Sequence, residues 1–162
     1  MDYSKIKFED EFEAEDDICQ VCGNDTMPRV GYNEKKDLLK FECPECGAVF
    51  IEDGKRKTTM IKGEERDWCK YLAEHLSLPF EAVVTEISDE EFFGVGDPGP
   101  IRYEDKLKVV SVDSEVDLYG VLVSVKKGRK KYVCPLIELA PTDRKSANAK
   151  LIDNYGTWFS CQ

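Results

Sequence analysis

The chain has 162 residues, of which 33 are acidic and 23 are lysine or arginine, so its formal net charge is −10. This length allows one medium domain or two small ones, and the negative charge argues against general binding to nucleic acid while it leaves surplus oxygen ligands for hard cations. Because no apolar run approaches membrane-spanning length and the first thirty residues lack the apolar core of a secretion signal, we expect a soluble cytoplasmic protein with reduced cysteines.

Residues 1–17 contain an acidic run from Phe8 to Asp17. The run is too charged to bury and too irregular to predict a helix, and such segments cannot bury enough apolar surface to offset the entropy lost on ordering. We therefore predict a mobile acidic tail over residues 1–17.

Two Cys-x-x-Cys-Gly motifs come next, Cys19–Gly23 and Cys43–Gly47. Each motif places two sulfurs on one tight turn, and the glycine after the second cysteine allows a positive φ. Four thiolates at this spacing fit the closed tetrahedral coordination of structural zinc, which leaves no position for a catalytic water. We predict a structural zinc site with ligands Cys19, Cys22, Cys43 and Cys46. The alternative is a pair of disulfides or free thiols, and disulfides require an oxidising compartment.

Three extended stretches surround these motifs, over residues 29–32, 38–41 and 48–51. Two metal-pinned turns with strands between them resemble a zinc ribbon, in which the strands form a small antiparallel sheet. We assign this ribbon to residues 18–52 and predict that the charged segment 53–63 is a linker.

From residue 64 the apolar period becomes helical and predicts a helix over about 64–77, which Pro79 ends. Strands are predicted over 80–87, 107–112, 119–125 and 131–136, and a helix capped by Ser146 over 147–159. Short antiparallel strands with tight turns and one longer loop are typical of a small SH3-like barrel. The expected fold class is α+β and mainly β, with an N-terminal zinc ribbon and, over residues 64–162, an SH3-like barrel with flanking helices.

Three carboxylates alternate between the first two long barrel strands, at Asp113, Glu115 and Asp117. Calcium takes about six to eight oxygen ligands, so three acids in one loop supply a large part of a site. The segment is not an EF-hand, because Leu118 and Ser124 occupy the positions that need glycine and a bidentate glutamate. The alternative is that these acids are simply solvated, as acids in turns commonly are.

Several short motifs in the second module resemble the cyanobacterial calcium-binding protein family (the CcbP family). They are Tyr71-Leu72, Leu78-Pro79-Phe80-Glu81-Ala82, Asp117-Leu118-Tyr119-Gly120, Gly128-Arg129-Lys130-Lys131-Tyr132, Pro135-Leu136 and Asp153-Asn154-Tyr155-Gly156-Thr157-Trp158-Phe159. The resemblance covers about residues 66–160. It implies a small β-barrel that binds calcium through surface carboxylates and acts as a calcium buffer or sensor. The zinc ribbon is a departure, because members of the family usually consist of the second module alone.

The resemblance extends the set of expected calcium ligands. Glu81 and Asp117 lie in matching stretches, whereas Asp113 and Glu115 rest on the clustering of acids. Glu138 and Asp143 follow the last strand, where the chain is expected to return to the same end of the barrel. We therefore expect reversible calcium binding by some of Asp113, Glu115, Asp117, Glu81, Glu138 and Asp143.

The remaining motifs suggest no reaction. The glycine-rich segment 94–100 formally matches a phosphate-binding pattern, but its prolines stand where a helix should open, so we predict a loop. The basic segment 126–131 is either a solubilising hairpin tip or a contact for phosphate or an acidic partner. His75 is expected to be a packing or surface residue, and the three remaining cysteines, Cys69, Cys134 and Cys161, are expected to be small core residues. No nucleophile is paired with a base, so an enzyme is not expected.

Two hypotheses follow from these observations. The leading one is a calcium-binding buffer or sensor with a structural zinc ribbon, without catalytic activity and without nucleic acid or membrane as a partner. The alternative is a zinc-ribbon module that docks on protein or RNA and has no calcium role. Calcium binding by the second module distinguishes the two.

Overall fold

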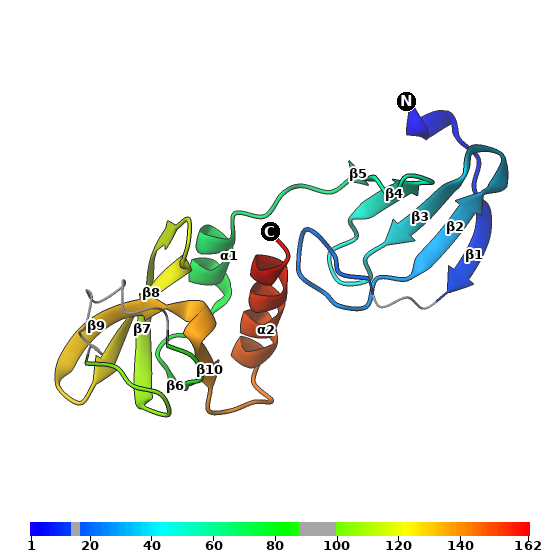
Figure 1. Ribbon diagram of the computed structural model, residues 1–162. Coiled ribbons are helices and arrows are strands. Elements are labelled where there is room, and N and C mark those ends of the chain that lie inside the picture. Colours follow the sequence, from blue (N-terminus) through cyan, green and yellow to red (C-terminus); the bar gives the residue numbers. More distant parts are fainter. Residues whose placement is uncertain (14–16, 88–99) are drawn as a thin grey trace. The chain divides into compact units, whose positions relative to one another are not determined.

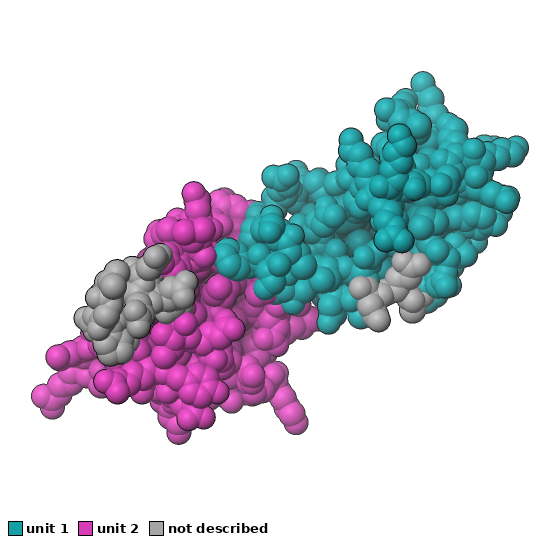
Figure 2. Space-filling model, viewed as in Figure 1, with its two compact units in different colours: residues 1–66, 157–162 teal, residues 67–156 magenta. Residues whose placement is uncertain are grey.

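The structure is a computed structural model that describes residues 1–13, 17–87 and 100–162 (Figure 1). The chain divides into two compact units, which Figure 2 shows in different colours. Unit 1 comprises residues 1–66 and 157–162, and unit 2 comprises residues 67–156. Each unit contains its own five-stranded sheet. Of the predicted loop 94–100, only residue 100 lies within the described residues.

The sheet of unit 1 is an antiparallel meander whose strands follow one another in chain order. Its strands are β1 (Glu9–Glu13), β2 (Arg29–Asn33), β3 (Leu38–Glu42), β4 (Val49–Asp53) and β5 (Thr58–Lys62), with short 3-10 turns η1 (Tyr3–Lys5) and η2 (Glu34–Lys36). The three strands predicted from the apolar stretches are confirmed as β2, β3 and β4. Val49, Phe50 and Ile51 of β4 are all buried, which fits a strand covered on both faces.

Two edge strands of this sheet differ from the sequence prediction. β1 lies inside the segment predicted as a mobile acidic tail, and it pairs with β2. Its acids are exposed except for Glu11, which is partly buried, and they bind across the strands. Arg29 forms ion pairs with Glu11, at 2.9 Å, and with Glu13, while the Tyr32 hydroxyl donates to Glu9 at 2.7 Å. β5 lies inside the predicted linker and pairs with β4. Pairing with a neighbouring strand, rather than burial of side chains, thus orders both segments.

Unit 2 combines a second sheet with two helices. The elements are α1 (Trp68–His75), β6 (Phe80–Val84), β7 (Lys106–Val116), β8 (Gly120–Lys127), β9 (Lys130–Pro135), a 3-10 turn η4 (Leu136–Glu138), β10 (Leu139–Pro141) and α2 (Ala147–Ser160). α1 is shorter than predicted because Asp67 caps its start, where its carboxylate accepts a hydrogen bond from Lys70 N at 3.0 Å. None of the helices in the described part of the chain is long and apolar enough to cross a membrane.

The predicted barrel is not confirmed, because the sheet of unit 2 is open. Its strand order is β10-β6-β7-β8-β9, with every neighbouring pair antiparallel. Within the described residues, no ladder joins β9 to β10, so the ring of hydrogen bonds that defines a closed barrel is absent. The long strand β7 has irregular register between Val109 and Ser111 and again between Val112 and Ser114. Such bulges bend a strand and increase its twist.

The core of unit 2 lies between the sheet and the two helices. Trp68 of α1 and Tyr155 of α2 are almost fully buried, and their ring centroids lie 5.4 Å apart. The Tyr155 hydroxyl accepts a hydrogen bond from Val121 N of β8 at 2.7 Å. Asn148 of α2 exchanges two hydrogen bonds with the backbone of Ser77, at 2.9 and 3.0 Å. The Tyr155 hydrogen bond therefore fixes α2 to the sheet, and the aromatic pair and the Asn148 hydrogen bonds join α2 to α1 and to the segment that follows it.

Candidate metal centre

Two turns of matching geometry present the four cysteines of unit 1. In each turn the glycine N–H donates to the carbonyl of the first cysteine at 2.9 Å, from Gly23 to Cys19 and from Gly47 to Cys43. Both glycines have positive φ, 69° and 71°. A Cβ on Gly47 would meet nothing within 4 Å, so this turn needs glycine for its backbone conformation and not for space.

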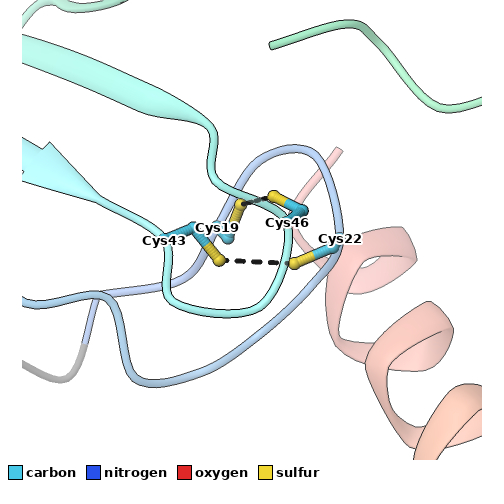
Figure 3. Close-up of side chains that lie close together, drawn as sticks. All are labelled: Cys19, Cys22, Cys43 and Cys46. Carbon is cyan, nitrogen blue, oxygen red and sulfur yellow. Dashed lines mark hydrogen bonds between the residues drawn. The ribbon is translucent and has the colours of Figure 1, made fainter. Parts of the chain in front are cut away.

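The four sulfurs of these turns converge on one point (Figure 3). The Cys19 and Cys46 sulfurs are 3.6 Å apart, those of Cys22 and Cys43 are 3.5 Å apart, and all four lie within 4.8 Å of one another. Sulfurs bound at about 2.3 Å to a tetrahedral zinc ion lie about 3.8 Å from each other. All seven cysteines are free thiols, so the disulfide alternative is not realised. The cluster is able to hold zinc.

The protons of the cluster are unevenly shared. A hydrogen bond from the Cys22 thiol lowers the pKa of Cys19 to about 5, and the backbone N–H groups of Val21 and Cys22 act in the same direction. The same contact raises the pKa of Cys22, because its proton is held by the neighbouring sulfur. Burial raises the pKa of Cys46 to about 11. The backbone of the first cysteine turn therefore stabilises negative charge on Cys19, as a thiolate metal ligand requires.

Apolar side chains enclose the cluster. Those packed with the cysteines in one buried group are Val21, Met27, Phe41, Ala48 and Phe50. Cys19, Cys22 and Cys43 are buried, and only Cys46 is partly exposed. Four thiolates in a closed apolar setting fit a structural site, because a catalytic zinc needs an open coordination position.

The first three calcium candidates lie at the far end of β7 and in the turn after it. Asp113 occupies the bulge between Val112 and Ser114. Its two carboxylate oxygens accept hydrogen bonds from the hydroxyls of Ser111, at 2.8 Å, and Ser124, at 2.6 Å. Glu115 and Asp117 are exposed. All three acids are therefore exposed, and hydroxyl groups hold the carboxylate of Asp113 in place.

The other three candidates lie elsewhere in unit 2. Glu81 is exposed on β6 opposite Lys108, and its carbonyl accepts a hydrogen bond from Thr142 N at 2.9 Å, which brings Asp143 to the same edge of the sheet. Glu138 is buried in η4. Among residues 1–13, 17–87 and 100–162, the only group of three or more cysteine, histidine or acidic side chains with converging donor atoms is the cysteine cluster. The six acids therefore do not form one prebuilt site.

One acid missed by the sequence reasoning, Asp67, acts electrostatically on the same thiol as two acids of the first group. The pKa of the Cys69 thiol on α1 is raised, first by burial and then by the negative charges of Asp67, Glu115 and Asp113. The negative charge of all three carboxylates thus acts on the same thiol, although Asp67 is distant from the others in sequence. Its position as the residue that caps α1 is the only sequence signal that it has. The free cysteines themselves differ: Cys134 is buried as predicted, whereas Cys161 is exposed and is not a core residue.

Comparison with known proteins bears on unit 2. A family model described as "Calcium binding", that of the CcbP proteins, matches residues 59–159. No curated protein and no solved structure matches the chain. The matched segment begins within β5, so the four clustered cysteines lie outside it.

Proposed function

Because the chain belongs to the CcbP calcium-binding family, we propose that it is a cytoplasmic calcium buffer or sensor that carries a structural zinc ribbon. The family match over residues 59–159 is the observation that carries this proposal. The surplus of carboxylates in the chain agrees with it, since calcium prefers oxygen ligands. The role requires no catalytic step.

We place the calcium site at the far end of β7, around Asp113, Glu115 and Asp117. The serine hydroxyls hold the Asp113 carboxylate in one orientation, which reduces the cost of ordering it around an ion. Glu115 and Asp117 are exposed and free to turn toward the same ion. Asp67, whose charge reaches the same thiol as those of Asp113 and Glu115, is a fourth candidate.

The proposed mechanism is charge neutralisation. Carboxylates that share a small region repel one another, and a bound divalent cation removes that repulsion and gathers the acids around itself. The first group of acids would therefore move closer together on binding and would order the turn between β7 and β8. A buffer needs only this local change, whereas a sensor also needs a partner that recognises the ordered turn. Glu81, Glu138 and Asp143 remain candidates for a second site.

Two further assignments complete the proposal. Cys19, Cys22, Cys43 and Cys46 would hold zinc as a structural ion, and zinc binding would contribute folding free energy to unit 1. We also propose that unit 2 is a partly open SH3-like barrel, because its strand order brings the last strand, β10, next to the first, β6. The two bulges in β7 support this assignment, since bulges provide the curvature that a barrel needs.

A calorimetric titration tests the calcium proposal. Calcium is added to the full chain after zinc loading and calcium removal, with magnesium as the competing ion and Asp113→Asn/Asp117→Asn as the test variant. Asp10→Asn/Asp25→Asn is the matched control, because it removes the same charge from exposed positions of unit 1. We expect saturable heat at micromolar to low millimolar calcium that the test variant loses and the control keeps.

Each other outcome has a defined meaning. No saturable heat beyond that of magnesium would contradict calcium binding and would leave the alternative, a protein or RNA interaction module. Equal losses in the test and control variants would contradict the location at β7 and leave calcium binding itself intact. Retained calcium binding in the test variant would indicate that the site lies instead among Glu81, Glu138 and Asp143.

A further inference from the structure

A row of lysines crosses the solvent face of the unit 2 sheet. The strand registers place Lys108 of β7 opposite Lys126 of β8, and Lys126 opposite Lys131 of β9. Lys106 lies on the same face as Lys108, because side chains two residues apart in a strand point the same way, and Leu107 between them is buried. Lys106, Lys108, Lys126 and Lys131 are exposed and form what we call the lysine row.

No ion pair neutralises this row in the part of the chain that the structure describes. None of its four lysines forms an ion pair there, whereas the neighbouring Lys127 binds Asp105 at 2.6 Å. The nearest carboxylate in register is that of Glu81, opposite Lys108. Like charges directly opposite each other destabilise a sheet. The chain has 33 acidic residues, and yet the positions opposite one another on β7, β8 and β9 are occupied by lysines.

Two general explanations account for only part of the row. Lysines protect an edge strand from pairing with other chains, which explains Lys131 on β9. Lys108 and Lys126 lie on β7 and β8, however, which are interior strands of the sheet. Solubility does not explain them either, because the net charge of −10 already keeps the chain far from neutrality.

The row borders a small cavity within unit 2. Its volume is about 230 Å³, and its lining residues are Glu81, Lys106, Leu107, Lys108, Lys126, Gly128 and Thr142. Gly128 has a φ of 63° and forms the tight turn from β8 to β9, so Arg129 and Lys130 follow directly at the rim. Three lysines and one acid, Glu81, thus line one concave site that is net positive, and three more cations lie next to it in sequence or register.

We propose that this cavity binds a compact oligophosphate group, such as a di- or triphosphate, through the lysine row. A lysine ammonium group carries a concentrated positive charge and donates hydrogen bonds to phosphate oxygens. Neighbouring strands lie about 4.8 Å apart, so Lys108 and Lys126 reach the same small anion. A bound oligophosphate offsets the repulsion between the lysines, which explains why the sheet places them opposite one another.

The surroundings favour a compact anion over a long one. Attraction from the row extends about 8 Å at physiological salt, and a nucleic acid strand would pass beyond it onto a predominantly acidic protein. Among the described residues, the cavity has no aromatic lining residue on which bases could stack. Leu107, the one apolar residue in the described lining, is buried, so this lining offers an acidic peptide no apolar anchor.

Calorimetry with inorganic tripolyphosphate tests the proposal on the zinc-loaded full chain in calcium-free buffer. The test variant is Lys108→Gln/Lys126→Gln. The control is Lys35→Gln/Lys36→Gln, which removes the same charge from the exposed turn η2 of unit 1. We expect saturable binding at one site, weakened about tenfold or more in the test variant and unchanged in the control. Circular dichroism of the test variant should show an intact fold, because the substitution removes repulsion.

Several results would overturn the proposal. The first is no saturable binding of tripolyphosphate at about 0.15 M salt. The second is an equal loss of affinity in the control variant, which would indicate a general charge effect. The third is tighter, lysine-dependent binding of an oligothymidylate or an oligoglutamate peptide, which would assign the row to a nucleic acid or to an acidic protein. Because calcium is absent throughout, failure here leaves the calcium proposal untouched.

Discussion

The two units differ in how their candidate metal ligands are arranged. In unit 1, four soft thiolates converge in a buried cluster that two short turns define. In unit 2, the acidic candidates are spread over β6, β7, η4 and two turns, and most of them are exposed. A closed thiolate site suits a structural zinc ion that stays bound in the fold, whereas dispersed carboxylates suit a calcium ion that binds reversibly. If the proposed sites are correct, one chain combines a permanent and a reversible mode of metal binding.

The largest expected effect comes from breaking the cluster. Cys22→Ser should remove a zinc ligand and unfold unit 1, since structural zinc contributes about 10–16 kcal/mol in finger-like peptides. Amide NMR spectra should lose dispersion for residues of β2 to β4 while those of β6 to β9 stay dispersed. Cys161→Ser, at an exposed cysteine outside the cluster, is the control and should keep one zinc per chain. Native dispersion of β2 to β4 without zinc would show that apolar contacts alone hold unit 1.

The second prediction breaks the apolar core on which unit 2 depends. Trp68→Ala should destabilise unit 2 by about 3–5 kcal/mol, because it removes a fully buried ring that packs on Tyr155. Denaturant unfolding followed by the amide signals of β7 and β8 measures the change. The zinc content should not change, because the substitution affects the core of unit 2 and not the cysteine cluster of unit 1. Trp68→Phe leaves a smaller cavity and should cost less, so equal losses in both variants would argue against cavity formation as the cause.

A smaller effect is expected from one buried hydrogen bond in the same core. Tyr155→Phe removes the acceptor of the Val121 N–H, which should cost about 1–3 kcal/mol because a buried donor loses its partner. Faster hydrogen exchange at Val121 would report this loss directly. Exchange as slow as in the wild type would show that another group accepts the bond.

The same residue gives a pH dependence with a defined sign. Burial raises the pKa of Tyr155 to about 12 from an ordinary value of 10.0. The folded state therefore holds the phenol proton more tightly than the unfolded state, and this contribution to stability is present below pH 10 and is lost as the pH rises toward 12. Tyr155→Phe should lack this alkaline loss. An identical pH profile in the variant would assign the loss to other groups.

Sequence reasoning succeeded where the structure is local. The cysteine spacing and the following glycines predicted the cluster, because each Cys-x-x-Cys-Gly motif forms a single turn. It failed where order comes from a partner strand: the acids of β1 read as a tail because their cross-strand partners, Arg29 and Tyr32, lie far along the chain. The open edge of the unit 2 sheet and the shared effect of Asp67 and Asp113 on Cys69 depend likewise on register and packing. The lysine row is of this kind too, since only the registers bring Lys108 beside Lys126.

The smallest predicted effect contrasts two neighbouring lysines of β8. Lys126→Gln should stabilise the ligand-free protein by about 0.2–1 kcal/mol, because it removes repulsion from Lys108 and Lys131 on either side. Lys127→Gln should destabilise it by up to about 1 kcal/mol, because it breaks the partly exposed pair with Asp105, whose pKa is lowered by the hydrogen bond from Lys127. Midpoints of denaturant unfolding measure both changes. If Lys126→Gln destabilises as much as Lys127→Gln, the row stabilises the sheet, and repulsion within it no longer argues for an anion.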